Sequence, residues 1–107
     1  MNKIDFLSLK SSDLGLFKIV VSKDQVSRYL GDEVAILNLK KGLYCGLNEV
    51  GACIWAQIQE PRSIQGIMDI LLKEYDVEPE QCRHDLLKLL QQLSDNELIE
   101  VMNETNN

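Results

Sequence analysis

The sequence predicts an α+β domain in which a three-stranded antiparallel sheet precedes three helices. Short apolar runs separated by glycine-containing turns fill residues 25–47, a pattern typical of paired strands. Beyond residue 48, apolar residues recur at spacings of three and four, the period of helices that bury one face. The chain has 107 residues, 45% hydrophobic and 26% charged, which suits one ordinary globular domain. We expect this domain to span residues 16–102, between an N-terminal segment, 1–15, and a tail, 103–107.

The first strands are predicted from their turns. Leu16–Val21 reads LFKIVV, a short extended run, and the turn-like residues before it are compatible with poor order, so we place no site there. Gln25–Leu30 and Glu33–Leu39 are separated by Gly31-Asp32, a pair suited to a two-residue turn with positive φ at Gly31. Glu33–Leu39 is apolar on both faces and is therefore expected at the centre of the sheet.

The third strand of the predicted sheet, LYCGL at Leu43–Leu47, lies at an edge. Gly42 is suited to the left-handed conformation that closes the preceding loop, so the strand pairs back on Glu33–Leu39. Native proteins block exposed edges with charge or proline, but here Lys40 and Lys41 lie only in the turn. An open edge accepts an extended peptide as a further strand through main-chain hydrogen bonds. The candidate peptide-binding residues of this edge are Leu43, Tyr44, Cys45, Gly46 and Leu47.

Three helices follow. Asn48 and Ser63 are suited to be N-cap residues, Pro61 ends the first helix, and Pro79 fits the first turn of the third. Gly51 is expected to weaken the first helix locally. The second helix carries a continuous apolar stripe, formed by Ile64, Ile67, Met68, Leu71, Leu72 and Tyr75. The third helix presents Cys82, Leu86, Leu89, Leu90 and Leu93, and an extended tail with Leu98, Ile99 and Val101 is expected to close the core.

Leu87 falls outside the stripe of the third helix. It lies about 100° of helical rotation from Leu86, on a flank with Arg83, Leu90 and Gln91. One interpretation is an isolated exposed leucine, which protein surfaces commonly show. The other is that an apolar partner covers it. In both cases we expect Leu87 to be exposed in the free protein.

Charge is uneven along the chain. Residues 1–75 hold nine basic and nine acidic side chains, and residues 76–107 hold two basic and eight acidic, so the net charge of -6 arises entirely in the last third. A protein held by phosphate contacts normally has a basic face, so this distribution argues against nucleic acid as a partner and suits a basic or neutral peptide. The sequence has neither a membrane-spanning apolar run nor a secretory signal, and we expect a cytoplasmic protein.

The sequence offers no catalytic or metal-binding constellation. Cys45, Cys53 and Cys82 are odd in number and lack CxxC spacing, so we interpret them as reduced thiols. His84 is the only histidine, and Cys82 beside it belongs to the apolar stripe, which argues against a metal site. A cysteine nucleophile would need a base and an orienting group. We therefore predict a binding protein without cofactor or metal, not an enzyme.

Two long stretches resemble a known family. They read LGDEVAILNLKKGLYCGLNEVGACIWAQI and SIQGIMDILLKEYDVEPEQCRHDLLKLLQQLSDNELI, and the most specific part is the pattern G-x-Y-x-x-LN-x-x-G-x-x-IW. They are similar to the PqqD-like family, the peptide-recognition elements of pathways that modify ribosomally made peptides. The resemblance covers residues 17–101 and leaves out the segment before Leu16.

The resemblance implies a winged-helix-like three-helix bundle after the sheet, which binds the leader segment of a precursor peptide and catalyses nothing. Free-standing members of this length look most like those of lasso-peptide clusters, where a separate leader peptidase acts on the delivered precursor. In the family the third helix forms the second wall of the peptide cleft. This placement makes Leu87 and Leu90 an apolar pocket floor and Arg83 a partner for a leader carboxylate, with Gln91 on the same flank.

Two other functions stay open. The resemblance also fits a chaperone that presents a peptide to a radical SAM enzyme in quinone-cofactor synthesis, which uses the same cleft. A winged-helix transcription regulator has the same architecture, because fold does not fix function. Its third helix would offer several basic side chains to DNA, whereas this one has Arg83 and Lys88 among Glu80, Asp85 and Asp95.

Overall fold

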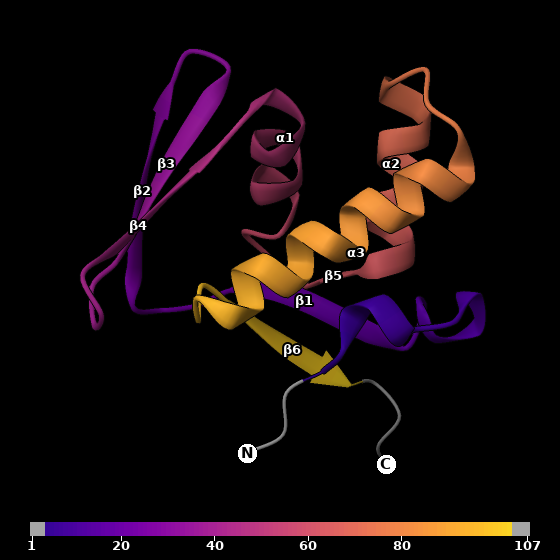
Figure 1. Cartoon of the computed structure of the whole chain (residues 1–107), viewed down its shortest axis with the longest axis horizontal. Helices are drawn as coiled ribbons and strands as arrows, with labels where there is room; N and C mark the ends of the chain where they lie inside the picture. The colour runs from indigo at the N-terminus through magenta and orange to yellow at the C-terminus, as the bar shows by residue number, and fades with distance from the viewer. Residues whose placement is uncertain (1–3, 104–107) are drawn as a thin grey trace.

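The computed structural model describes residues 4–103, with three α-helices, six strands and two short 3-10 helices in that range (Figure 1). In chain order the elements are η1 (Phe6–Ser8), η2 (Ser11–Asp13), β1 (Phe17–Val21), β2 (Gln25–Leu30), β3 (Glu33–Asn38), β4 (Leu43–Leu47), α1 (Glu49–Gln57), β5 (Arg62–Ser63), α2 (Ile64–Glu74), α3 (Pro79–Asp95) and β6 (Ile99–Asn103). No helix among them is long and apolar enough to cross a membrane.

The strands of residues 4–103 form two antiparallel sheets, in the orders β2-β3-β4 and β5-β1-β6. The first is the predicted sheet, with β3 in the centre, so that prediction is confirmed. The second joins the strand predicted near residue 17 to the extended tail after α3, through pairs from Phe17↔Asn103 to Val21↔Ile99. Figure 1 shows β2, β3 and β4 at the left, β1 and β6 below α1 and α2, and α3 running diagonally from the α2 side to the β6 side. The α+β class is therefore confirmed.

Two glycine turns build the β2-β3-β4 sheet. Gly31 has φ 67° and Gly42 has φ 68°, the left-handed conformation that side chains with a Cβ rarely adopt. The buried Asn38 then ties the second turn to α3. Its Oδ1 accepts the N–H groups of Lys40 and Lys41, and its Nδ2 donates to the Asn96 carbonyl at 2.8 Å. This amide fixes the start of β4 relative to the end of α3.

The predicted helix starts are confirmed. Asn48 Oδ1 and Ser63 Oγ each accept a backbone N–H three residues on at 2.9 Å, and Pro79 occupies the first turn of α3. Gly51 has a packing role that composition did not indicate. A Cβ on Gly51 would lie 2.9 Å from the Leu47 Cβ, so α1 approaches the end of β4 more closely than any other residue would allow.

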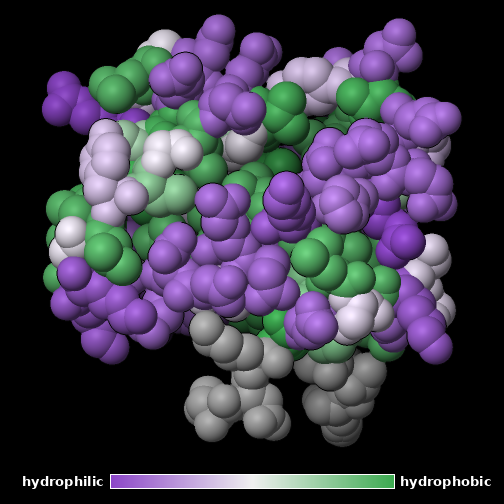
Figure 2. Space-filling view, viewed as in Figure 1, coloured by the Kyte–Doolittle hydropathy of each residue, from purple (hydrophilic) through white to green (hydrophobic). Residues whose placement is uncertain are grey.

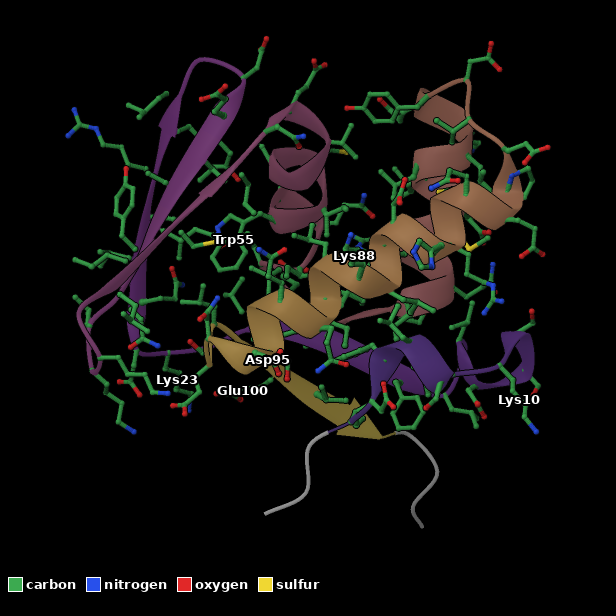
Figure 3. All side chains as sticks on the ribbon, viewed as in Figure 1. Lys10, Lys23, Trp55, Lys88, Asp95 and Glu100 are labelled. Carbon is green, nitrogen blue, oxygen red and sulfur yellow. The ribbon has the colours of Figure 1, made fainter. Side chains whose placement is uncertain are left out.

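The core lies between α1, α2, α3 and the two sheets. Its centre is Trp55, a fully buried side chain that lies between α1 and the β2-β3-β4 sheet (Figure 3). The Trp55 Nε1 donates to Ser27 Oγ at 3.2 Å, so the one polar atom of this ring has a partner.

The buried side of α3 differs from the prediction. Leu87 is only 2% exposed, whereas Leu89, predicted to be core, is only half-buried. The reason is the N-terminal segment, which packs against α3 through η1 with Phe6 completely buried. The segment before β1 contains the short 3-10 helices η1 and η2, and η1 packs on the flank of α3 that the apolar stripe predicts to be exposed.

Candidate functional site

The β4 strand is an open edge of the sheet. Within residues 4–103 it pairs with β3 on one side and with no strand on the other. Two of its apolar side chains are largely exposed to solvent, Leu43 at 48% and Tyr44 at 71%. The structure therefore shows the exposed edge that Leu43–Leu47 predicts.

The pairing of β2 with β3 decides which backbone groups of β4 remain free. In a pair of antiparallel strands, residues whose N–H and C=O groups form hydrogen bonds with the neighbouring strand alternate with residues whose N–H and C=O groups point away from that strand. Leu30 and Glu33 flank the two-residue turn and therefore form a hydrogen-bonded pair. Hydrogen-bonded pairs recur at every second residue, and the Leu39 N–H accordingly donates to the Asp24 carbonyl at 2.9 Å. The odd-numbered residues of β3 therefore bond to β2, and the even-numbered ones bond to β4.

It follows that Tyr44 and Gly46 present their backbone groups at the open edge. The even-numbered residues of β3 stand opposite Leu43, Cys45 and Leu47, which use their N–H and C=O groups within the sheet. Tyr44 and Gly46 lie between them, so each directs one donor and one acceptor outward. A Cβ on Gly46 would meet nothing within 4 Å, which leaves the edge accessible at that residue.

An apolar groove of about 490 Å³ adjoins the Leu47 end of this edge, where Gly46 and Leu47 form part of its lining. Figure 2 shows hydrophobic residues recessed between α1 and α3, with hydrophilic residues around them. Three groups of side chains line the groove. The β4 and α1 wall contains Gly46, Leu47, Asn48, Val50, Gly51 and Ile54, one end is formed by Leu71, Tyr75 and Val77, and the α3 wall contains Gln81, Cys82, Asp85, Leu86, Leu89 and Gln92.

The predicted site residues on α3 do not line this groove. Leu87 and Leu90 are buried in the core. Arg83 donates from Nη1 to the Leu9 carbonyl at 3.1 Å, and Gln91 Oε1 accepts the Phe6 N–H at 2.8 Å. The expectation that Leu87 is exposed is therefore wrong, because the N-terminal segment packs on this flank of α3.

A different face of α3 forms the second wall. Asp85, Leu89 and Gln92 follow one another at helical spacing, and all three line the groove. Helical periodicity alone did not predict these residues, because it places Leu89 in the core stripe. The available signal was the extra width of that stripe, since Leu86, Leu87, Leu89 and Leu90 together cover more of the helix than one buried face needs.

A family model described as coenzyme PQQ synthesis protein D (PqqD) matches residues 33–99. The chain belongs to the PqqD family. The match begins at β3 and ends at the start of β6, so it contains the open edge and both walls of the groove. A search of curated proteins gave no match.

Solved structures share this fold. TbiB1 in complex with the TbiA(beta) leader peptide superposes with a TM-score of 0.72 at 36% sequence identity, over 76% of this chain and 94% of that chain. Lasso peptide synthetase B1 complexed with the leader peptide gives 0.68 at 21% identity, over 77% and 96%. The PqqD truncation of Methylobacterium extorquens PqqCD, a stand-alone RiPP recognition element studied by solution NMR, gives 0.67 at 16% identity, over 91% and 99%.

The three cysteines of this PqqD-family protein, Cys45, Cys53 and Cys82, are free, and the thiol pKa of two of them is raised. Burial raises the pKa of the Cys45 thiol, and burial together with the Asp85 carboxylate raises that of Cys82. A raised thiol pKa lowers the thiolate fraction, which is the reactive form. Among the described residues, no group of three His, Cys, Asp or Glu side chains is placed to hold a metal ion.

Proposed function

We propose that this protein binds the leader segment of a ribosomally made precursor peptide and presents it to another enzyme without catalysing a reaction itself. The observation that carries this proposal is the open β4 edge beside an apolar groove, in a chain 36% identical to TbiB1, whose solved structure is a leader-peptide complex. The receiving enzyme is a leader peptidase or another maturation enzyme of a lasso-peptide pathway.

The geometry defines how the leader is held. The peptide adds to β4 as a fourth strand, and its main chain exchanges hydrogen bonds with Tyr44 and Gly46. Side chains alternate along a strand, so every second peptide residue points into the groove and the others lie on the outer face beside Tyr44. Apolar residues at the inward positions contact Leu89, Ile54 and Leu71, which line the groove.

The regulator alternative receives less support from α3. Helices that read DNA place basic side chains in the major groove, and phosphate contacts dominate the affinity. The exposed residues of α3 include Glu80, Asp85 and Asp95 beside Lys88 and His84. A surface with this charge repels the phosphate backbone. The alternative role in quinone-cofactor synthesis uses the same edge and groove and differs in the peptide and in the receiving enzyme.

Amide hydrogen exchange tests the proposed strand addition. The ligand is the cognate leader peptide, added to the isotope-labelled protein, and exchange is followed by NMR. We expect the amides of Tyr44 and Gly46 to exchange rapidly in the free protein and slowly in the complex. The Cys45 amide, which already bonds to β3, changes little. Equal protection of all three amides, or protection confined to α3, is inconsistent with strand addition at β4.

The non-catalytic part of the proposal has its own test. The purified protein and the leader-bearing precursor are incubated together for hours and the precursor is followed by mass spectrometry. We expect no mass change until the pathway's maturation enzyme is added. Cleavage or modification of the precursor by the purified protein alone contradicts the proposal.

A further inference from the structure

The groove beside β4 has one sign of charge. Asp85 is the charged residue among its lining side chains, and it is exposed on the α3 wall. The Asp85 Oδ1 accepts a hydrogen bond from Gln81 Nε2 at 2.9 Å, which holds the carboxylate in place without neutralising it. A ligand in the groove therefore meets apolar side chains and one fixed negative charge.

Further carboxylates stand around the same end of the groove. Glu49 follows the lining residue Asn48 directly, and Glu74 precedes the lining residue Tyr75. Both act on Tyr75, since its pKa is raised first by burial, then by the Cys53 thiol, and then by the charges of Glu49 and Glu74. Asp85 therefore lies in the α3 wall, and Glu49 lies in the first turn of α1 between the lining residues Asn48 and Val50.

No lysine or arginine among residues 4–103 lines the groove. Lys40 and Lys41 stand at the opposite end of β4, in the β3–β4 turn, where each contacts an acidic side chain. Arg83 lies on the N-terminal flank of α3. Lys88 is on the exposed side of α3 and does not line the groove (Figure 3). A ligand in the groove therefore meets Asp85 and no basic side chain of the lining.

We propose that the groove is selective for a basic extended peptide, in which a lysine or arginine lies at the Leu47 end of the added strand, against Asp85 and Glu49. This inference rests on the proposed strand addition and deepens it by naming the chemistry of the ligand. Complementary charge beside a partly desolvated apolar contact speeds association and fixes the register of the bound strand.

A displayed library of random peptides about twelve residues long is the probe, because it carries no assumption about the leader. Peptides retained by the full-length protein are sequenced and aligned on their enriched apolar residue. We expect lysine and arginine to exceed aspartate and glutamate at one flank of this apolar residue by about three- to tenfold, which is the size of effect of one exposed to half-buried charge pair.

Variants assign the selectivity to the groove. In Asp85→Asn together with Glu49→Gln, the enrichment of basic residues should disappear while apolar residues remain enriched. The matched control is Glu60→Gln, an exposed carboxylate outside the groove lining, which should leave the selection unchanged. Persistence of the basic preference in the double variant overturns the inference.

The salt dependence of the affinity is a second test, made on the selected peptides. Between roughly 0.05 and 0.5 M salt, the affinity of a selected basic peptide should fall severalfold, and that of its Lys→Gln version should change little. Apolar-anchored peptides without charge preference would contradict this inference and leave the proposed strand addition intact. Recovery of no peptide at all would contradict both.

Discussion

Gly46 is the residue at which the open edge is most easily tested. Its N–H points away from β3, by the alternation set at the β2–β3 turn, and no atom occupies the space beside its Cα. Proline at this position removes an outward donor and leaves the pairing of β4 with β3 intact. We expect Gly46→Pro to weaken leader binding at least tenfold, measured by fluorescence anisotropy, with unchanged circular dichroism.

Tyr29→Pro is the matched control for Gly46→Pro. Tyr29 lies on β2, the opposite edge of the same sheet, and its N–H also points away from β3. Leader affinity should therefore stay within about twofold of the parent protein. Equal losses in the two variants would mean that binding depends on the whole sheet rather than on the β4 edge.

Leu89 and Leu87 form a second contrast at the scale of single residues. Leu89 is half-buried and lines the groove, whereas Leu87 is buried against the N-terminal segment. Leu89→Asp should weaken leader binding by about 1.5–3 kcal/mol with a small change in melting temperature, since one apolar contact is lost. Leu87→Asp should lower the free energy of unfolding by more than about 3 kcal/mol, because it buries an unpaired charge.

Titration calorimetry and melting curves on both leucine variants decide this prediction. It is the reverse of what the helical stripe alone indicates, which makes Leu89 core and Leu87 surface. A Leu89→Asp protein that melts as early as Leu87→Asp, or that binds the leader normally, would show that the groove assignment is incorrect.

At the scale of elements, the junction of β4 with α1 has the tightest packing that bears on the site. Helix propensity predicts that Gly51→Ala stabilises α1 by about 1 kcal/mol. The structure predicts the opposite sign, because the new Cβ would lie 2.9 Å from the Leu47 Cβ. Relieving this overlap moves α1 away from β4, and overpacking of this kind costs about 1–3 kcal/mol.

Chemical denaturation of Gly51→Ala measures the change in the free energy of unfolding. Gly46→Ala is a suitable comparison, since a Cβ at that residue meets nothing within 4 Å and should change stability little. If Gly51→Ala is more stable than the parent protein, the close approach of α1 to β4 does not exist in solution.

At the scale of the whole molecule, the two flanks of α3 contact different parts of the protein. One flank lines the groove, and the other holds the N-terminal segment through Phe6, with hydrogen bonds from Arg83 to the Leu9 carbonyl and from the Phe6 N–H to Gln91. The N-terminal segment thus packs against the helix that forms the second wall of the groove. Figure 1 shows it beside α3, on the side away from the β2-β3-β4 sheet.

Phe6→Ala tests whether the two flanks of α3 are independent. Removing a fully buried phenylalanine should lower the free energy of unfolding by about 3–5 kcal/mol. Under conditions where the variant remains folded, its leader affinity should be close to that of the parent protein, because Phe6 is not part of the groove. A selective loss of binding in folded Phe6→Ala would show that the two flanks of α3 are coupled.

The sequence by itself determined the α+β class, the order of β2, β3 and β4, the helix starts at Asn48, Ser63 and Pro79, and the exposed edge at Leu43–Leu47. Each of these depends on local chemistry: a left-handed glycine, an N-cap, or the alternation and length of an apolar run. Such signals act within a few residues, so they are readable before any tertiary contact is known.

Only the tertiary structure decided which face of α3 lines the groove. Leu87 and Leu89 are the same residue type on one helix, and their burial depends on what packs against each side. The N-terminal segment, more than 70 residues away in sequence, hydrogen-bonds to Arg83 and Gln91, which stand one helical turn on either side of the buried Leu87. Leu89 instead lines the groove. Helical periodicity predicts a broad apolar stripe on α3, but it does not predict which part of that stripe a distant segment of the chain will bury.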